Sequence, residues 1–320
     1  MGTIFRVYVD ADLETAQPAV MAALSEIERL EDVLSEWRDD SEISEINRSA
    51  GVRPVKVSDE VFAVIEAGVK VSEWSGGAFD LSWAALRGLY SFDPDHPKIP
   101  SLEELRPRLD LIDYKEIELD SKAKTVFLKK KGMAIGTGAI AKAMRSIAPA
   151  EYSARGIENY MIFGGGQVQV HGQRRDDRPW RVGIQHPRSA EHYFGSLESE
   201  GASFSTSGDY ENVIIDRDGK RWHHIIDTKT GLPADKTMSV TVVSSSGIYA
   251  DALSTAAFVL GPERALKMFE SLPIDADLVI VGIDCVFRSS ALKKSTFRTN
   301  EELGADVANN KALPLCNAER

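Results

Sequence analysis

Two short stretches of the sequence place proton-transfer groups and hard metal ligands near each other in the chain. His223-His224-Ile225-Ile226-Asp227 sets two histidines and an aspartate around an apolar, strand-like pair, and Ala250-Asp251-Ala252-Leu253-Ser254-Thr255 follows about two dozen residues later. On a helix, Asp251 and Thr255 would share one face, because residues four apart are neighbours there. Their oxygens suit Mg²⁺, which takes further ligands from water and substrate phosphates. The pattern predicts metal-assisted chemistry on a charged substrate.

Each stretch also has an ordinary structural interpretation. A histidine pair at a strand end is often polar surface, and an aspartate one turn before a threonine often lies on a solvated helical face. The functional interpretation gains support because further motifs occur in the same chain.

A glycine-rich turn, Gly136-Thr137-Gly138-Ala139-Ile140-Ala141-Lys142, precedes a predicted helix. It matches the G-x-G-x-x-A pattern of dinucleotide-binding folds, with Glu158 about 20 residues further on. The antiparallel hairpin before it disfavours that fold. We expect a turn whose backbone approaches a ligand, with free N–H groups for phosphate and Lys142 as a nearby charge. The structural alternative is a tight turn with a solvated lysine.

Three further segments could line a pocket. Ser75-Gly76-Gly77-Ala78-Phe79-Asp80 ends a predicted helix. It is either only a C-cap with Phe79 in the core, or a segment whose backbone lines a planar ligand while Asp80 accepts a hydrogen bond. Phe163-Gly164-Gly165-Gly166-Gln167 joins two predicted strands, and its glycines permit close packing. Ser205-Thr206-Ser207-Gly208-Asp209-Tyr210 offers hydroxyls to phosphate or to the backbone.

Long helices interrupt runs of mostly antiparallel strands, which predicts an α+β fold. After a strand in the first nine residues, helical periodicity covers residues 12–36, and Asp59 is expected to cap a helix ending near Trp74. Residues 37–44 and 93–101 are predicted loops, residues 115–130 a hairpin, and a helix runs from the Gly138 turn to about residue 154. Further strands are predicted at 159–163, 167–171, 180–185, 203–206, 212–216, 221–226, 237–244, 276–282 and 285–288, and helices at 250–260 and 262–271.

Composition narrows the class of protein. The 320 residues are 43% hydrophobic and 27% charged, a balance that supports one large core. We expect one domain over residues 1–290 and a partly disordered C-terminal extension over 291–320. The net charge of −11 repels nucleic acid, so no nucleic-acid partner is expected and an anionic ligand must be held by local groups.

The sequence also bears on compartment and redox chemistry. It has no signal-peptide pattern and no apolar run long enough to span a bilayer. We expect a cytoplasmic protein as the sequence is written, or a periplasmic or cell-envelope protein if an export segment was removed. Cys285 and Cys316 have no metal-ligand spacing and leave a single disulfide open.

Seven motifs, taken in order, resemble those of the ApbE-type FAD:protein FMN transferases. They are Met1-Gly2-Thr3, Asp40-Ser41-Glu42-Ile43-Ser44, Ser75-Gly76-Gly77-Ala78-Phe79-Asp80, Gly138-Ala139-Ile140-Ala141-Lys142, Thr206-Ser207-Gly208-Asp209-Tyr210, His223-His224-Ile225-Ile226-Asp227 and Ala250-Asp251-Ala252-Leu253-Ser254-Thr255. The resemblance covers residues 1 to about 290. It implies a single α+β domain related to the tunnelling fold, or T-fold.

The activity implied by this resemblance is Mg²⁺-dependent transfer of FMN from FAD to a threonine or serine hydroxyl of an acceptor protein, with release of AMP. The acceptor is expected to be a membrane redox subunit. By resemblance, Asp251, Thr255 and the carbonyl of Ala139 hold Mg²⁺, and His224 is the base. Contacts with FAD are expected from Met1, Trp37, Ala78, Phe79, Asp80, Lys142 and Ile225.

The chain departs from the family pattern at several positions. Gly136 stands where many members have aspartate, Ala143 replaces a usual glycine, and Phe163 and Gln167 stand where asparagine or aspartate is common. Trp37 occupies a position where tyrosine is usual, and it can still stack on an aromatic ring. Two alternatives stay open: hydrolysis of FAD to FMN and AMP, or FAD binding without catalysis. The oligomeric state is also open.

Overall fold

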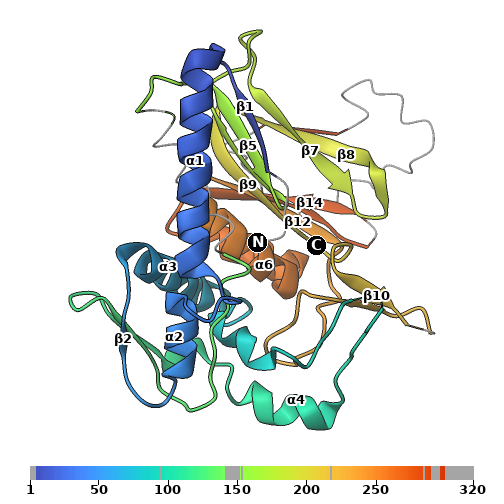
Figure 1. Cartoon of the computed structure of the whole chain (residues 1–320). Helices are drawn as coiled ribbons and strands as arrows, with labels where there is room; N and C mark the ends of the chain where they lie inside the picture. Colours follow the sequence, from blue (N-terminus) through green and yellow to red (C-terminus); the bar gives the residue numbers. More distant parts are fainter. Residues whose placement is uncertain are drawn as a thin grey trace.

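The computed structural model describes residues 5–93, 95–140, 152, 154–216, 218–283, 285–289 and 296–299 (Figure 1). The predicted α+β fold is confirmed, and every described strand pair is antiparallel. The largest sheet has the order β1 (Phe5–Val9), β5 (Tyr160–Gly164), β6 (Gln167–His171), β9 (Gly201–Gly208), β12 (Ser239–Ser244), β13 (Ala276–Val281) and β14 (Val286–Arg288). Because the glycine-rich turn follows no parallel strand in the described part of the chain, the dinucleotide-fold interpretation is set aside.

Smaller sheets and helices surround the large sheet. The smaller sheets are β15 (Thr296–Thr299) with β8 (Ser189–Ser199) and β7 (Trp180–His186); β2 (Val55–Lys56) with β4 (Thr125–Leu128) and β3 (Ile117–Asp120); and β10 (Val213–Ile215) with β11 (Arg221–His223). The helices are α1 (Leu13–Leu34), α2 (Glu42–Arg48), α3 (Asp59–Ser75), α4 (Leu102–Leu109), α6 (Gly247–Leu260) and α7 (Pro262–Glu270), with 3₁₀ helices η1 (Leu81–Leu86) and η2 (Tyr114–Glu116).

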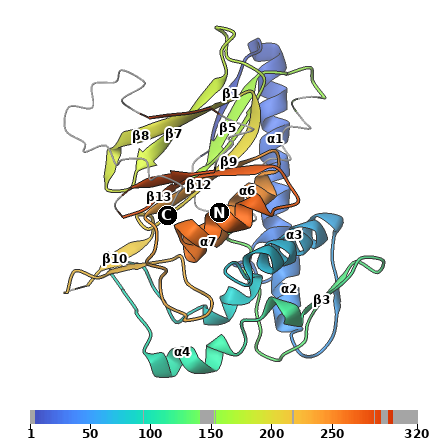
Figure 2. The same cartoon turned by 180° about the vertical axis from the view of Figure 1, so that it is seen from behind.

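Helix α6 lies at the centre of the molecule, between one face of the large sheet and α3 (Figure 2). It is apolar almost all round, as expected of a helix with neighbours on every side. Ala250, Ala252, Ala256 and Ala257 are fully buried. These small side chains let the sheet and α3 approach the helix closely.

Strand β9 shows different chemistry on the two faces of the large sheet. On the face away from α6, apolar side chains such as Phe204 pack against the β7–β8–β15 sheet. On the opposite face, β9 presents Ser205 and Ser207 to α6, while Val240 of β12 and Ile280 of β13 belong to the apolar core there. The period-2 alternation of β9 therefore places its hydroxyls on the face that meets α6.

Local capping explains where several helices begin. Ser58, rather than the predicted Asp59, caps α3 by accepting a hydrogen bond from the Val61 N–H. Ser41 caps α2, so a helix begins inside the predicted loop 37–44. Ser101 forms a capping box with Glu104 and starts α4, which sequence analysis did not predict. Short helices with strong caps have too little apolar periodicity to stand out in sequence.

Other differences concern the extent of elements. Strand β8 was not predicted, and β11 ends at His223 rather than at residue 226. The predicted helix after the Gly138 turn lies largely outside the described residues. Within the predicted C-terminal extension, β15 pairs with β8 and buries Phe297. Cys285 is disulfide-bonded. None of the helices in the described part of the chain is both long enough and apolar enough to cross a bilayer.

Candidate active site

A buried group of oxygen atoms lies between β9 and α6; we call Ser205, Ser207, Asp251 and Thr255 the polar seam. The Ser205 hydroxyl donates to Oδ1 of Asp251 at 2.9 Å, and the hydroxyls of Ser207 and Thr255 are 3.3 Å apart. Asp251 is only 7% exposed. The predicted helical spacing thus places both residues on the face of α6 that meets the sheet, not on a solvated face.

Two neighbouring residues extend the polar seam. The Ser254 hydroxyl lies 2.8 Å from that of Ser207 and donates to the Asp251 carbonyl. Gln167 is paired with Ser205 in the β6–β9 ladder, and its Nε2 donates to the carbonyl of Gly247 in the first turn of α6. Its Oε1 is buried and has no hydrogen-bond partner among the described residues. Buried polar atoms are normally satisfied, so this amide oxygen suits a ligand.

The donor set of the polar seam fits a hard cation. It offers a buried carboxylate and three hydroxyls, with the amide oxygen of Gln167 beside them, and hard cations such as Mg²⁺ and Ca²⁺ prefer oxygen ligands. Ala139, the third predicted ligand, is half-buried and packs against the same core cluster to which α6 contributes Ala250 and Leu253.

The histidine segment is fixed near the end of the same helical face. His223 is 3% exposed, its Nε2 lies 2.8 Å from the Ala234 carbonyl, and its ring meets Phe258 edge-on at 5.6 Å. Phe258 lies one turn beyond Thr255 on α6. His224 follows immediately and is half-buried, while Ile225 is buried in the core.

An ion-pair cluster around Asp209 supports this segment. Asp209 accepts two hydrogen bonds from Arg188, at 2.6 and 2.7 Å, and Arg221 of β11 lies 3.6 Å from it. The carboxylate therefore joins the β7–β8 turn to the hairpin that carries His223. This accounts structurally for the aspartate of the Thr206–Tyr210 motif.

The turn at residues 77–80 is joined to the histidine loop. The Thr228 hydroxyl donates to the Gly77 carbonyl at 2.5 Å. Ala78 and Phe79 are buried, at 5% and 2% exposed. The C-cap interpretation is confirmed, because Gly76 is a left-handed C-cap and Phe79 lies in the core. The interpretation that this segment lines a ligand stays a prediction.

Asp80 has a structural role that the sequence did not reveal. Its Oδ1 accepts hydrogen bonds from the N–H and hydroxyl of Ser82, and its Oδ2 accepts one from the Tyr114 N–H. Burial raises the pKa of this carboxyl group, although these hydrogen bonds oppose the shift. Asp80 therefore caps η1 and holds η2 beside it.

Trp37 is 75% exposed, and the guanidinium of Arg87 lies 5.1 Å from its ring centroid. Arg87 also forms an ion pair with Glu36 at 3.2 Å. Sequence reasoning missed Glu36 and Arg87, because neither belongs to a motif. Met1, Lys142 and Ala143 lie outside the described residues.

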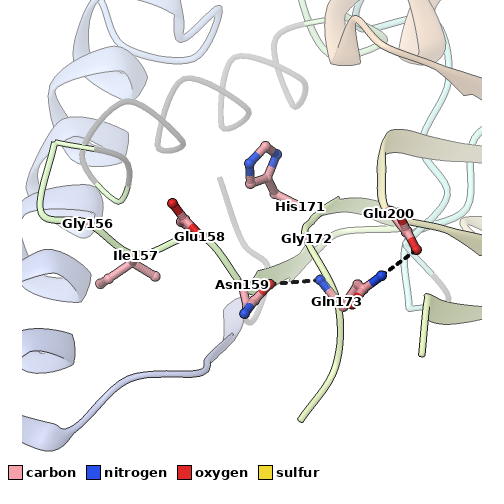
Figure 3. Close-up of a pocket in the computed structure, with 8 residues that line it drawn as sticks. All are labelled: Gly156, Ile157, Glu158, Asn159, His171, Gly172, Gln173 and Glu200. Carbon is pink, nitrogen blue, oxygen red and sulfur yellow. Dashed lines mark hydrogen bonds between the residues drawn. The ribbon is translucent and has the colours of Figure 1, made fainter. Parts of the chain in front are cut away.

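A separate hollow of about 600 Å³ lies at the other end of strands β5 and β6, and no predicted site residue lines it (Figure 3). His171 and Glu158 border it, and Gln173 links Asn159 to Glu200 by hydrogen bonds. His171 pairs with Tyr160, whereas Gln167 beside the polar seam pairs with Gly164. The strand length thus separates the hollow from the polar seam.

A family model described as the ApbE family matches residues 1–279. The chain belongs to this family. It is 35% identical over 269 residues to the FAD:protein FMN transferase of Klebsiella pneumoniae, covering 82% of each chain. It is 32% identical over 301 residues to that of Vibrio cholerae, covering 91% of this chain and 88% of the other.

Solved structures of the family share the fold. The ApbE protein of Thermotoga maritima superposes with a TM-score of 0.81 at 30% identity, covering 90% of this chain and 94% of the other. The flavin transferase ApbE of Vibrio cholerae superposes with a TM-score of 0.77 at 29% identity, covering 91% and 94%.

The burial of His223 predicts a pH dependence of stability. Burial lowers the pKa of His223 below its ordinary value of 6.5, although the Ala234 carbonyl and Asp209 partly oppose this shift. Below pH 6.5 the unfolded chain therefore binds a proton at His223 more readily than the folded chain does. The contribution of this histidine to the free energy of unfolding is fully present above pH 6.5 and is lost as the pH falls through the folded pKa.

Thermal unfolding between pH 7.5 and 5 should show this loss, and His223→Gln should reduce it. His96→Gln, at a histidine whose side chain is 85% exposed, is the matched control and should leave the pH profile unchanged. Equal pH profiles for His223→Gln and the wild type would contradict the prediction.

The three hydrogen bonds to Asp80 predict a stability effect without ligand. Asp80→Asn places an NH₂ group against backbone donors and should lower the free energy of unfolding of the FAD-free protein by about 1–3 kcal/mol. Asp113→Asn, at the residue that caps η2 nearer the surface, should cost less. Denaturant unfolding measures both. If Asp80→Asn changes only FAD affinity, the ligand-contact role is correct instead.

Proposed function

We propose that this protein transfers FMN from FAD to a threonine or serine hydroxyl of an acceptor protein, with Mg²⁺ at the polar seam. The relatives named FAD:protein FMN transferase support the reaction class. The observation that carries the proposal for this chain is the buried carboxylate of Asp251 on α6, which accepts a hydrogen bond from Ser205 of β9. Toward its C-terminal end the same helix contacts His223 through Phe258.

Asp251, Thr255 and the carbonyl of Ala139 hold the cation. The oxygen-only donor set and the unsatisfied Oε1 of Gln167 support a hard ion at this place. When bound, Mg²⁺ neutralises charge on the pyrophosphate as the bond to AMP breaks. Burial makes Asp251 effective, because little water screens its charge.

The group transfer is a single substitution at phosphorus. The acceptor hydroxyl oxygen attacks the FMN-side phosphorus of FAD, and the bond from that phosphorus to the bridging oxygen breaks. AMP leaves with the bridging oxygen, and the new bond is a phosphoester. His224 takes the proton from the attacking hydroxyl, a task suited to an imidazole near neutral pH.

The remaining predicted residues bind FAD. Trp37 offers an exposed aromatic face, and the Arg87 guanidinium over it adds positive charge beside the anionic ligand. Ala78, Phe79 and Ile225 are buried, and their contacts with FAD rest on the resemblance, as do those of Met1, Asp80 and Lys142. We further propose that the acceptor is a domain of a membrane redox subunit.

The central test is the fate of FAD incubated with the protein and Mg²⁺, in the presence and in the absence of an acceptor domain. With Mg²⁺ and an acceptor domain, the protein should give a covalently yellow acceptor and one AMP per flavin attached. FMN formed without acceptor at a comparable rate would instead indicate a pyrophosphatase. FAD binding without AMP release in any mixture would indicate a non-catalytic flavin-binding protein.

Two substitutions separate the roles at the site. His224→Ala should lower the transfer rate about 10²–10⁴-fold while FAD affinity stays near that of the wild type. Asp251→Asn should instead weaken Mg²⁺ binding in calorimetry and raise the Mg²⁺ concentration needed for transfer. His96→Ala is the control for loss of an exposed histidine. A His224→Ala protein with full transfer activity would remove the proposed base.

A further inference from the structure

The carboxylate of Glu36 lies buried beside the glycine-rich turn, one hundred residues away in sequence. Glu36 is 8% exposed, and its Oε2 accepts hydrogen bonds from the N–H groups of Thr137 at 2.6 Å and Gly138 at 3.3 Å. Thr137 and Gly138 are the two residues just before Ala139. The position of the Ala139 carbonyl is therefore coupled to a side chain from the end of α1.

Gly136 leaves the space that this carboxylate occupies. A Cβ atom built at Gly136 would lie 2.7 Å from Oε2 of Glu36, and 3.1 Å from atoms of Ala84 and Trp83. Gly136 is not among the residues with positive φ, so space rather than backbone conformation requires glycine here. Glu36 and Gly136 thus form a matched pair in which a long acid fills the place of a side chain at 136.

The other hydrogen bonds that hold this turn are made to backbone carbonyl groups of η1 and α1. Gly136 N–H donates to the Leu81 carbonyl of η1 at 2.8 Å, and the Thr137 hydroxyl donates to the Leu34 carbonyl at 2.7 Å. Glu36 is the one charged group among these anchors. Charge-assisted hydrogen bonds are roughly twice as strong as neutral ones, so its removal releases the turn more than loss of a neutral contact would.

Glu36 also joins the turn to the exposed Trp37 face. Arg87 lies 3.2 Å from Oε2 of Glu36, and its Nη1 donates to the Glu36 carbonyl at 3.3 Å. The same guanidinium lies over the Trp37 ring. Arg87 balances the buried carboxylate, which would otherwise repel a diphosphate close to it.

We propose that Glu36 is a positioning residue for the cation and FAD site: it fixes the backbone of residues 137–139 so that the Ala139 carbonyl faces the polar seam. This inference rests on the proposed function. It assigns Glu36 no contact with the reacting atoms. It further states that a carboxylate on residue 136 can replace that of Glu36, because aspartate readily bonds the N–H two residues ahead.

The experiment is a double-mutant cycle of wild type, Glu36→Ala, Gly136→Asp and the double variant. Each protein is measured by Mg²⁺ calorimetry with FAD present, AMP release with an acceptor domain, and melting temperature without ligand. Glu36→Ala should weaken Mg²⁺ binding about tenfold, equivalent to ~1.4 kcal/mol. Gly136→Asp alone should lower both Mg²⁺ affinity and melting temperature, because two carboxylates then compete for one place.

The double variant should recover. We expect Mg²⁺ affinity within roughly threefold of wild type and a melting temperature above that of either single variant, short of full recovery because Ala84 and Trp83 must shift slightly. Glu26→Ala is the matched control, because Glu26, like Glu36, forms an ion pair with an arginine. Its partner is Arg29 of α1, and this ion pair lies near the surface. It should change none of the three measurements.

The outcomes separate the two claims. A wild-type protein that binds no Mg²⁺ and releases no AMP overturns the proposed function, while recovery of melting temperature in the double variant would still support the matched pair. The inference is overturned if the wild type is fully active but the double variant binds Mg²⁺ no more tightly than the weaker of the two single variants. Glu36→Ala with unchanged Mg²⁺ affinity overturns it as well.

Discussion

The candidate site depends on keeping a carboxylate buried between a strand and the central helix. Asp251 lies on a helix whose other buried side chains are mostly alanine, leucine and phenylalanine, and an isolated charge among them would be very unfavourable. The hydroxyl of Ser205 offsets part of this cost, and a hard cation would offset more. Ser205 belongs to the face of β9 that meets α6, whereas Ala202 and Phe204 on the strand's other face belong to an apolar cluster. Burial of the Asp251 charge therefore lowers the stability of the fold at α6, whereas the proposed cation site requires that charge.

Long-range anchors bring the other groups to this interface. The loop after His223 is tied to α6 by Phe258, to the Gly77 turn by Thr228, and to the segment after η1 by the Tyr90 hydroxyl, which donates to the Gly231 carbonyl. Each anchor is a single contact rather than a regular ladder, and the two hydrogen bonds are partly buried. The site is thus built from loops whose ends are held by a rigid helical and sheet core, as is common where chemistry occurs.

Much of this arrangement could be predicted from sequence, because it follows local periodicity or an ordered set of motifs. The apolar spacing in α1 and the pairing of Asp251 with Thr255 on one helical face are local properties of the chain. The contact between Glu36 and the turn at Gly136 is not local, and the sequence pattern of neither segment predicts it. Asp80 was predicted as a ligand contact, yet its cap role depends on where Tyr114 lies in three dimensions. All the ligand contacts, the metal ligands and the catalytic role of His224 remain predictions.

The central sheet joins distant parts of the chain in a way that affects biosynthesis. Among the described strands, β1 pairs with β5 alone, about 150 residues later, so β1 and the side of α1 that packs near it have no sheet to pack on while the intervening chain is made. At a synthesis rate of about 5–20 residues per second, that interval is roughly eight to thirty seconds. A nascent chain of this kind exposes an unpaired strand edge on the ribosome, which makes early chaperone capture valuable and truncation from the C-terminal side costly.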